Sequence, residues 1–227
     1  MRRALLLGGV AAALLAACDP KDHGAAPPAA PDPLAPLHDF EESRRKTTDF
    51  AHLPASDQTL GPDPYAIRVL PGAGPPRFVA LLRGRSALVL LDASLNERAR
   101  IAAPASPTGL AVAPDGEIFV SGEQASFVAR YRVSAEQLRP GDPLPLPGVL
   151  ALRDLALGPE RILYAVESHE GRLLSIPLDH PDHLDRQRAF PVGEGAFRVA
   201  REGAFVIVDS LLDHRLSIFP VDAAGFP

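Results

Sequence analysis

The chain has 227 residues, a formal net charge of −5 at pH 7 and one cysteine, Cys18. Its acidic balance argues against a nucleic-acid partner, because phosphate binding needs a clustered basic surface and the longest basic run is Arg44, Arg45 and Lys46. A single cysteine excludes an intramolecular disulfide, a cysteine-rich zinc site and a Cys-x-x-Cys-His haem attachment within these residues.

The first eighteen residues carry the features of an export signal. Arg2 and Arg3 precede an apolar run, residues 4–17, which is too short to cross a bilayer as a helix. The run ends in a Leu-Ala-Ala-Cys sequence at Cys18, which resembles the lipobox of bacterial lipoproteins. The resemblance implies that residues 1–17 are a signal peptide and that Cys18 is lipidated. A conventional signal with a coincidental cysteine is the alternative.

Acylation of Cys18 predicts a cell-envelope protein that is held at the membrane by its N-terminal lipid and faces the periplasm or the cell surface. Asp19 resembles the residue that retains enterobacterial lipoproteins at the inner membrane, and it therefore favours that membrane. Removal of Arg2 and Arg3 with the signal would change the formal charge from −5 to −7.

Residues 18–61 are predicted to form a lipidated tether. Pro and Ala dominate residues 25–33, and residues 41–46 are charged, so the segment has too little apolar surface to offset the entropy of ordering. Proline-rich runs favour an extended geometry of ~3.1 Å per residue. A proline-rich ligand for a partner's groove is the alternative, although the segment has no repeated P-x-x-P core with a flanking basic residue.

An internal repeat decides the fold class. Ser175 and Ser217 are equivalent residues 42 positions apart, and Val133 and Leu178 are 45 apart. Four stretches read as two strands around a polar turn, the first of them a fainter copy: residues 78–92, 116–133, 160–178 and 203–221. Another short strand is predicted before each hairpin, at residues 65–70, 108–113, 152–157 and 196–200. Fourth strands are predicted at residues 98–102, 143–146 and 186–192.

Four short strands per repeat, with Pro and Gly at the joints, predict an all-β fold. We expect a β-propeller or partial propeller of about four blades, each a four-stranded antiparallel sheet, over residues 62–227. Residues 107–116 resemble blades of the NHL, YVTN and gluconolactonase-like propellers. Residues 208–219 resemble the NHL pattern of strand, Asp-Ser, Asn-His-Arg and strand, but with one extra residue and with Asp213 in place of Asn.

Three complete blades and the first three strands of a fourth fit into the sequence. Unpaired sheet edges are a liability that closure of the ring removes. In one arrangement, a strand within residues 47–60 completes the last blade and closes a four-bladed ring. In the other, which we favour because residues 47–60 read poorly as a strand, the blades stay open and pair with another chain or aggregate.

Six polar residues near the turns between second and third strands are the candidate ligand-binding residues: Glu123, Glu167, His169, Asp209, Asp213 and His214. A ring of carboxylates there could hold Ca²⁺, and the resemblance to gluconolactonase-like enzymes implies a Lewis-acid role for such a metal. The structural interpretation, which we favour, is that carboxylates at these points accept hydrogen bonds from backbone N–H groups of tight turns.

The sequence contains no Gly-x-Ser-x-Gly elbow, no His-Glu-x-x-His motif and no glycine-rich phosphate loop before a helix. It therefore predicts no catalytic residue and no cofactor other than the Ca²⁺ considered above, and the identity of any metal is left open. The first hypothesis is a non-enzymatic envelope module that binds a protein or a surface polymer. The alternative is a metal-dependent hydrolase of the lactonase or esterase kind.

Overall fold

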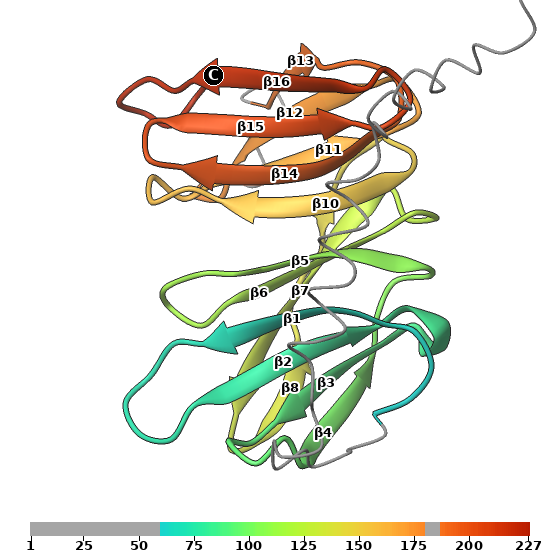
Figure 1. The fold of residues 1–227 in the computed structure, drawn as a ribbon. Coiled ribbons are helices and arrows are strands. Elements are labelled where there is room, and N and C mark those ends of the chain that lie inside the picture. Colours follow the sequence, from blue (N-terminus) through green and yellow to red (C-terminus); the bar gives the residue numbers. More distant parts are fainter. Residues whose placement is uncertain (1–59, 180–186) are drawn as a thin grey trace, which may run out of the picture. The chain divides into compact units, whose positions relative to one another are not determined.

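The computed structural model describes residues 60–179 and 187–227. The predicted signal peptide, Cys18 and nearly all of the predicted tether therefore lie outside the described residues. The described chain is built from strands β1 to β16 (Figure 1), and its one helical turn is the 3₁₀ turn Arg83–Arg85. No helix in this part of the chain has the length and apolar character needed to cross a bilayer.

The strands form four antiparallel sheets, called blades one to four in chain order. Blade one contains β1 (Pro64–Leu70), β2 (Arg77–Leu82), β3 (Ala87–Leu91) and β4 (Glu97–Ala102). Blade two contains β5 (Pro107–Val112), β6 (Ile118–Gly122), β7 (Phe127–Ser134) and β8 (Gln137–Pro140), with the short β9 (Leu144–Pro145) also paired to β7. Blade three contains β10 (Leu152–Leu157), β11 (Ile162–Glu167), β12 (Arg172–Pro177) and β13 (Arg188–Pro191). Blade four contains β14 (Ala196–Glu202), β15 (Phe205–Ser210) and β16 (Arg215–Pro220).

This arrangement confirms the predicted all-β fold with four propeller blades, the last of which has three strands. One strand prediction is wrong. The fourth strand of blade two is β8, residues 137–140, and not residues 143–146, where only the two-residue β9 forms. The hairpin between β7 and β8 turns at Ala135 and Glu136, both with positive φ, and these residues are not typical of such turns.

Apolar clusters lie at the three junctions between successive blades. Val79, Leu81, Leu88 and Leu90 of blade one pack with residues of blade two such as Leu110. A second cluster joins blades two and three, and a third joins Tyr164 and Val166 of blade three to residues of blade four. Full burial of each such side chain contributes about 1.5–3 kcal/mol to folding. Successive side chains of a strand point to opposite faces of the sheet, so an internal blade presents apolar side chains to both of its neighbouring blades.

Each junction also carries an inter-blade hydrogen bond that is buried on at least one side. The Tyr131 hydroxyl donates to the Ala102 carbonyl at 2.9 Å, which links blade two to blade one. The Thr108 hydroxyl donates to the Leu152 carbonyl at 2.8 Å. The Val199 N–H donates to the Asp154 carboxylate at 3.2 Å, which links blade four to blade three. Polar links of this kind orient neighbouring blades more sharply than apolar packing alone.

A backbone motif recurs at the start of every blade. The residue before the first strand has a positive φ, and its carbonyl accepts a hydrogen bond from the N–H that follows the second strand. The pairs are Asp63 with Arg83, Ser106 with Glu123, Ala151 with Ser168 and Gly195 with Leu211, at 2.9, 3.0, 3.1 and 3.0 Å. The pairing register of each first strand then shifts by one residue, as in a β-bulge, at Tyr65, Thr108, Arg153 and Phe197. These four side chains are therefore placed at the same end of the blades.

The first strands β1, β5, β10 and β14 contact one another in chain order. No strand of blade one packs extensively on a strand of blade four, and none of the apolar clusters in the described residues joins them. One contact between them is a guanidinium over a ring: Arg198 lies 5.2 Å from the ring centre of Tyr65. The strand considered within residues 47–60 lies outside the described residues except for Leu60, which packs against blade one.

Candidate functional site

The six predicted ligand-binding residues lie at or beside the turns between the second and third strands of blades two, three and four. Glu123 directly follows β6, and Glu167 and Asp209 lie at the ends of β11 and β15. His169, Asp213 and His214 occupy the turns themselves and are exposed. No group of three or more potential metal ligands comes together among residues 60–179 and 187–227.

Glu167 stabilises the turn that follows it. Its side chain is fully buried, and its carboxylate accepts the backbone N–H groups of His169 at 2.9 Å and of Glu170 at 3.0 Å. The Arg172 guanidinium donates to the same carboxylate at 3.3 Å. A buried charge with this many donors is well compensated, so the geometry matches the turn-forming role expected from the sequence.

The other three predicted acids also have partners within the fold. Asp209 accepts the backbone N–H of Arg198 at 2.8 Å, and Asp213 accepts that of Glu194 at 2.8 Å. Glu123 accepts from the guanidinium of Arg153, which also donates to the Ser168 hydroxyl at 3.2 Å. Glu123 and Arg153 therefore tie blade two to blade three at this end of the blades.

A cluster of arginine and aromatic side chains lies at the same end of the first strands. The guanidiniums of Arg83 and Arg198 lie 5.0 and 5.2 Å from the ring centre of Tyr65, within the range of a cation–π contact. Arg198 also lies 5.0 Å from the ring centre of Phe197. Arg83 is paired with Asp63 at 2.7 Å, whereas Arg198 has no ion-pair partner in the described part of the chain.

The carboxyl of Asp154, in blade three, interacts with positive charges from both terminal blades. The residue is 5 % exposed, and burial raises the pKa of its carboxyl above the ordinary value of 3.8. Backbone N–H groups of Val199 and Leu155, and the positive charges of Arg198 and Arg68, oppose that rise in pKa. Arg68 donates to its neighbour's carbonyl at 2.9 Å, and it too lacks an ion-pair partner among the described residues. Two guanidiniums thus share the surroundings of one buried carboxyl.

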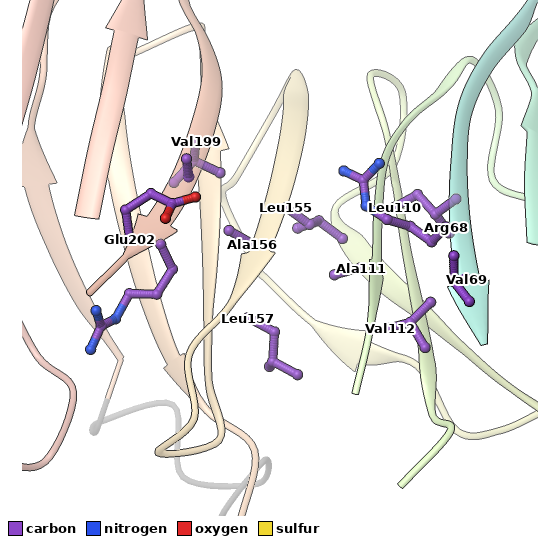
Figure 2. A pocket seen from close by; sticks show the side chains of 12 residues that line it. Arg68, Val69, Leu110, Ala111, Val112, Leu155, Ala156, Leu157, Val199 and Glu202 are labelled. Atoms are coloured by element: carbon purple, nitrogen blue, oxygen red, sulfur yellow. The ribbon is translucent and has the colours of Figure 1, made fainter. Parts of the chain in front are cut away.

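A cavity of about 380 Å³ opens between the first strands of all four blades. Figure 2 shows Arg68 and Val69 of β1 on one side and Val199 and Glu202 of β14 on the other, with apolar side chains of β5 and β10 between them. Arg198 immediately precedes Val199 in β14. The cavity and the arginine cluster are therefore adjacent along the same strands.

The sequence analysis did not predict five residues of this site: Tyr65, Arg68, Arg153, Asp154 and Arg198. A usable signal was present, since Arg153 and Asp154 interrupt a strand that is otherwise largely buried, and Arg198 occupies the equivalent repeat position to Asp154. The prediction considered residues at the turns, where carboxylates are common because they accept hydrogen bonds from backbone N–H groups.

Comparison with known proteins identifies the fold of the chain but assigns it to no family. No family model matches the chain, and no curated protein matches it. Among solved structures, a putative 6-phosphogluconolactonase from Bacteroides fragilis superposes with a TM-score of 0.58 at 14% identity, covering 77% of this chain and 55% of that one. The periplasmic gluconolactonase PpgL of Pseudomonas aeruginosa gives a TM-score of 0.56 at 17% identity, covering 71% and 51%.

A third similar structure is the β-propeller domain of Cps50 (Swd1) from Myceliophteria thermophila, with a TM-score of 0.54, 13% identity and coverage of 70% and 54%. The chain thus spans about half the length of these propellers. At such low identity the likeness extends to architecture alone. The chain has the β-propeller fold, in common with lactonases and with other propellers.

Proposed function

We propose that this chain is a lipid-anchored cell-envelope module whose β-propeller binds an anionic group of a protein or a surface polymer. The ligand would occupy the end of the first strands and the adjoining cavity, where Arg198 lies over the ring of Tyr65 and Arg68 lines the wall. His169 and His214, exposed in the turns at that end, would form its rim. Binding of this kind needs no cofactor.

One observation carries the proposal: Arg68 in the wall of the cavity and Arg198 over the ring of Tyr65 are two guanidiniums that have no ion-pair partner within the described residues. Guanidinium groups bind carboxylate and phosphate oxygens in a paired geometry. The predicted acids Glu167, Asp209 and Asp213 accept backbone hydrogen bonds instead, which supports a structural role for them and gives the hydrolase alternative no favouring observation.

The test measures binding of the purified protein to three immobilised polymers: polygalacturonate, polyphosphate and neutral dextran. The double variant Arg68→Ala, Arg198→Ala should lose at least tenfold in affinity for the anionic polymers, because each charge-assisted hydrogen bond contributes about 1.5–3 kcal/mol. Preference for one of the two anions would tell carboxylate from phosphate recognition.

The matched control for this test is Arg139→Ala, which removes an exposed arginine from the outer strand β8. The control variant should bind as the parent does. Equal loss in both variants would mean that the polymers respond to overall charge, and binding to dextran as strong as to the anions would overturn the proposal.

A further inference from the structure

A smaller cavity, of about 290 Å³, lies between blades three and four at the end where their first strands begin. Leu211 and Leu212, in the turn after β15, form an open part of its wall and are 53% and 71% exposed. Pockets for small ligands begin at about 300 Å³, so this cavity has room for one apolar group of side-chain size. The side chains that line it are Ala196, Phe197, Leu211 and Leu212 of blade four and Arg153 and Ser168 of blade three.

The apolar wall of this cavity is a departure from the repeat. The N–H that closes each blade belongs, in blades one to four, to Arg83, Glu123, Ser168 and Leu211. The first three of these residues have polar side chains that are hydrogen-bonded within the fold. Blade four instead has two successive leucines that the fold leaves exposed, although polar residues suit a surface turn. Apolar surface of this kind, beside a cavity, is typical of a binding site.

The backbone keeps the leucine turn close to the first strand of blade four. The Leu211 N–H donates to the Gly195 carbonyl at 3.0 Å, and Gly195 has a φ of 67°. A Cβ atom at Gly195 would lie 2.6 Å from Cγ of Leu212, so a side chain there would push the turn away. The shape of the cavity therefore depends on glycine at this position.

Two guanidiniums lie beside the cavity. Arg153 lines it, and its hydrogen bonds to Ser168 and Glu123 use Nε and Nη1, so Nη2 has no hydrogen-bond partner among the described residues. Arg198 lies 5.0 Å from the ring centre of Phe197, a ring that lines the cavity. An anion bound at Arg198 would therefore have an apolar cavity within the length of one side chain.

We propose that this cavity binds a large apolar side chain of a protein partner, next to an acidic residue whose carboxylate pairs with Arg198. The inference rests on the proposed function, because it uses the same guanidinium, and it selects one of the two partners considered there. Polysaccharides and polyphosphate carry no apolar group for the cavity, whereas a polypeptide does. Burial of the apolar group supplies affinity, and the guanidinium supplies the choice of an acidic neighbour.

The test measures fluorescence polarisation of three short labelled peptides with neutral, capped ends. Their central residues are Asp-Phe, Asn-Phe and Asp-Ser in an otherwise identical Gly-Ser background. The purified protein should bind the Asp-Phe peptide at least tenfold more tightly than either of the others, because one lacks the charge and the other lacks the apolar group.

The double variant Leu211→Ser, Leu212→Ser removes the exposed part of the cavity wall. It should bind the Asp-Phe peptide at least tenfold more weakly than the parent and no more tightly than the Asp-Ser peptide. The matched control is Leu150→Ser, because Leu150 is 55% exposed and does not line the cavity. The control should keep the affinity of the parent, and circular dichroism checks that both variants are folded.

The parent protein alone separates failure of this inference from failure of the proposed function. Equal affinity for the Asp-Phe and Asp-Ser peptides, together with binding to polygalacturonate or polyphosphate, would overturn the apolar subsite and leave anion binding in place with a polymer as partner. Absence of binding to every peptide and both anionic polymers would overturn both. A folded leucine double variant that binds the Asp-Phe peptide as the parent does would also overturn the inference.

Discussion

Glu167 is a fully buried acid whose importance is structural. It accepts two backbone N–H groups of its turn and a guanidinium of the following strand. Loss of its charge leaves those donors with a weaker partner in a site that water does not reach. Glu123 of blade two lies one repeat position later, equivalent to Ser168, and it joins two blades through Arg153. Acids near corresponding turns thus serve different contacts.

Glu167→Gln is therefore expected to lower the free energy of unfolding by about 1–3 kcal/mol, the cost of leaving buried donors poorly paired. Urea unfolding of the purified protein measures the change. Glu170→Gln is the control, because Glu170 pairs with the same Arg172 from a side chain that is 55% exposed, and exposed pairs contribute about 0–1 kcal/mol. Equal losses in the two variants would contradict the role given to the buried carboxylate.

Residue types and turn positions could be predicted for the acids, but their partners could not. The N–H groups that Asp209 and Asp213 accept come from β14 and the segment before it, residues that the repeat alone does not place beside them. Arg68, Arg153 and Arg198 were missed because their significance depends on which strands lie side by side, and a linear pattern does not contain that information.

Among the secondary-structure elements, the turn between β7 and β8 is one that the sequence pattern does not predict. Ser134 pairs with Gln137, so the loop consists of Ala135 and Glu136, with φ of 47° and 62°. Asn-Gly or Asp-Gly usually occupies such a turn, because in the left-handed region Cβ lies too close to the following carbonyl oxygen, a clash that Gly avoids and that Asn and Asp tolerate through local hydrogen bonds. The hairpin was therefore not visible in the sequence, and the fourth strand of blade two was predicted several residues too late.

Replacing Ala135 by Asn and Glu136 by Gly should stabilise the protein by about 1 kcal/mol, because the left-handed conformation costs roughly that much for an ordinary residue. Thermal or urea unfolding of the double variant measures the gain. Glu136→Gln keeps the side-chain crowding while it removes the charge, and it should leave stability unchanged. A gain in this variant as large as in the double variant would assign the effect to charge and not to the backbone.

For the whole molecule, blade number and order were predictable because each blade repeats one alternating pattern within a contiguous stretch. The strands before the hairpins, such as residues 152–157, match β10 and its equivalents closely. The sequence does not show whether the first and last blades pack on each other, because an apolar residue looks the same in a sequence whether it faces a neighbouring blade or solvent. Exposure of Phe205, Leu216 and Ile218 is a property of the assembled sheets.

The proposed anchor is also a property of the whole chain, since it joins the propeller to a membrane. Cys18→Ser should move the protein from the detergent phase to the aqueous phase in a phase-partition assay and abolish its labelling by palmitate in a bacterial host. Asp19→Ser, which keeps the cysteine, should retain the label. Persistent labelling of the Cys18→Ser protein would contradict the lipoprotein assignment.

The hydrogen bond from the end of each second strand back to the residue before the first strand has a consequence for how the protein is made. It closes each blade on itself using only nearby residues, and the junctions then join successive blades. Contacts that are short-range along the chain form quickly, and assemblies of neighbouring units can grow from one end. The propeller can therefore acquire its structure blade by blade, in the order in which a ribosome or a secretion channel delivers the polypeptide.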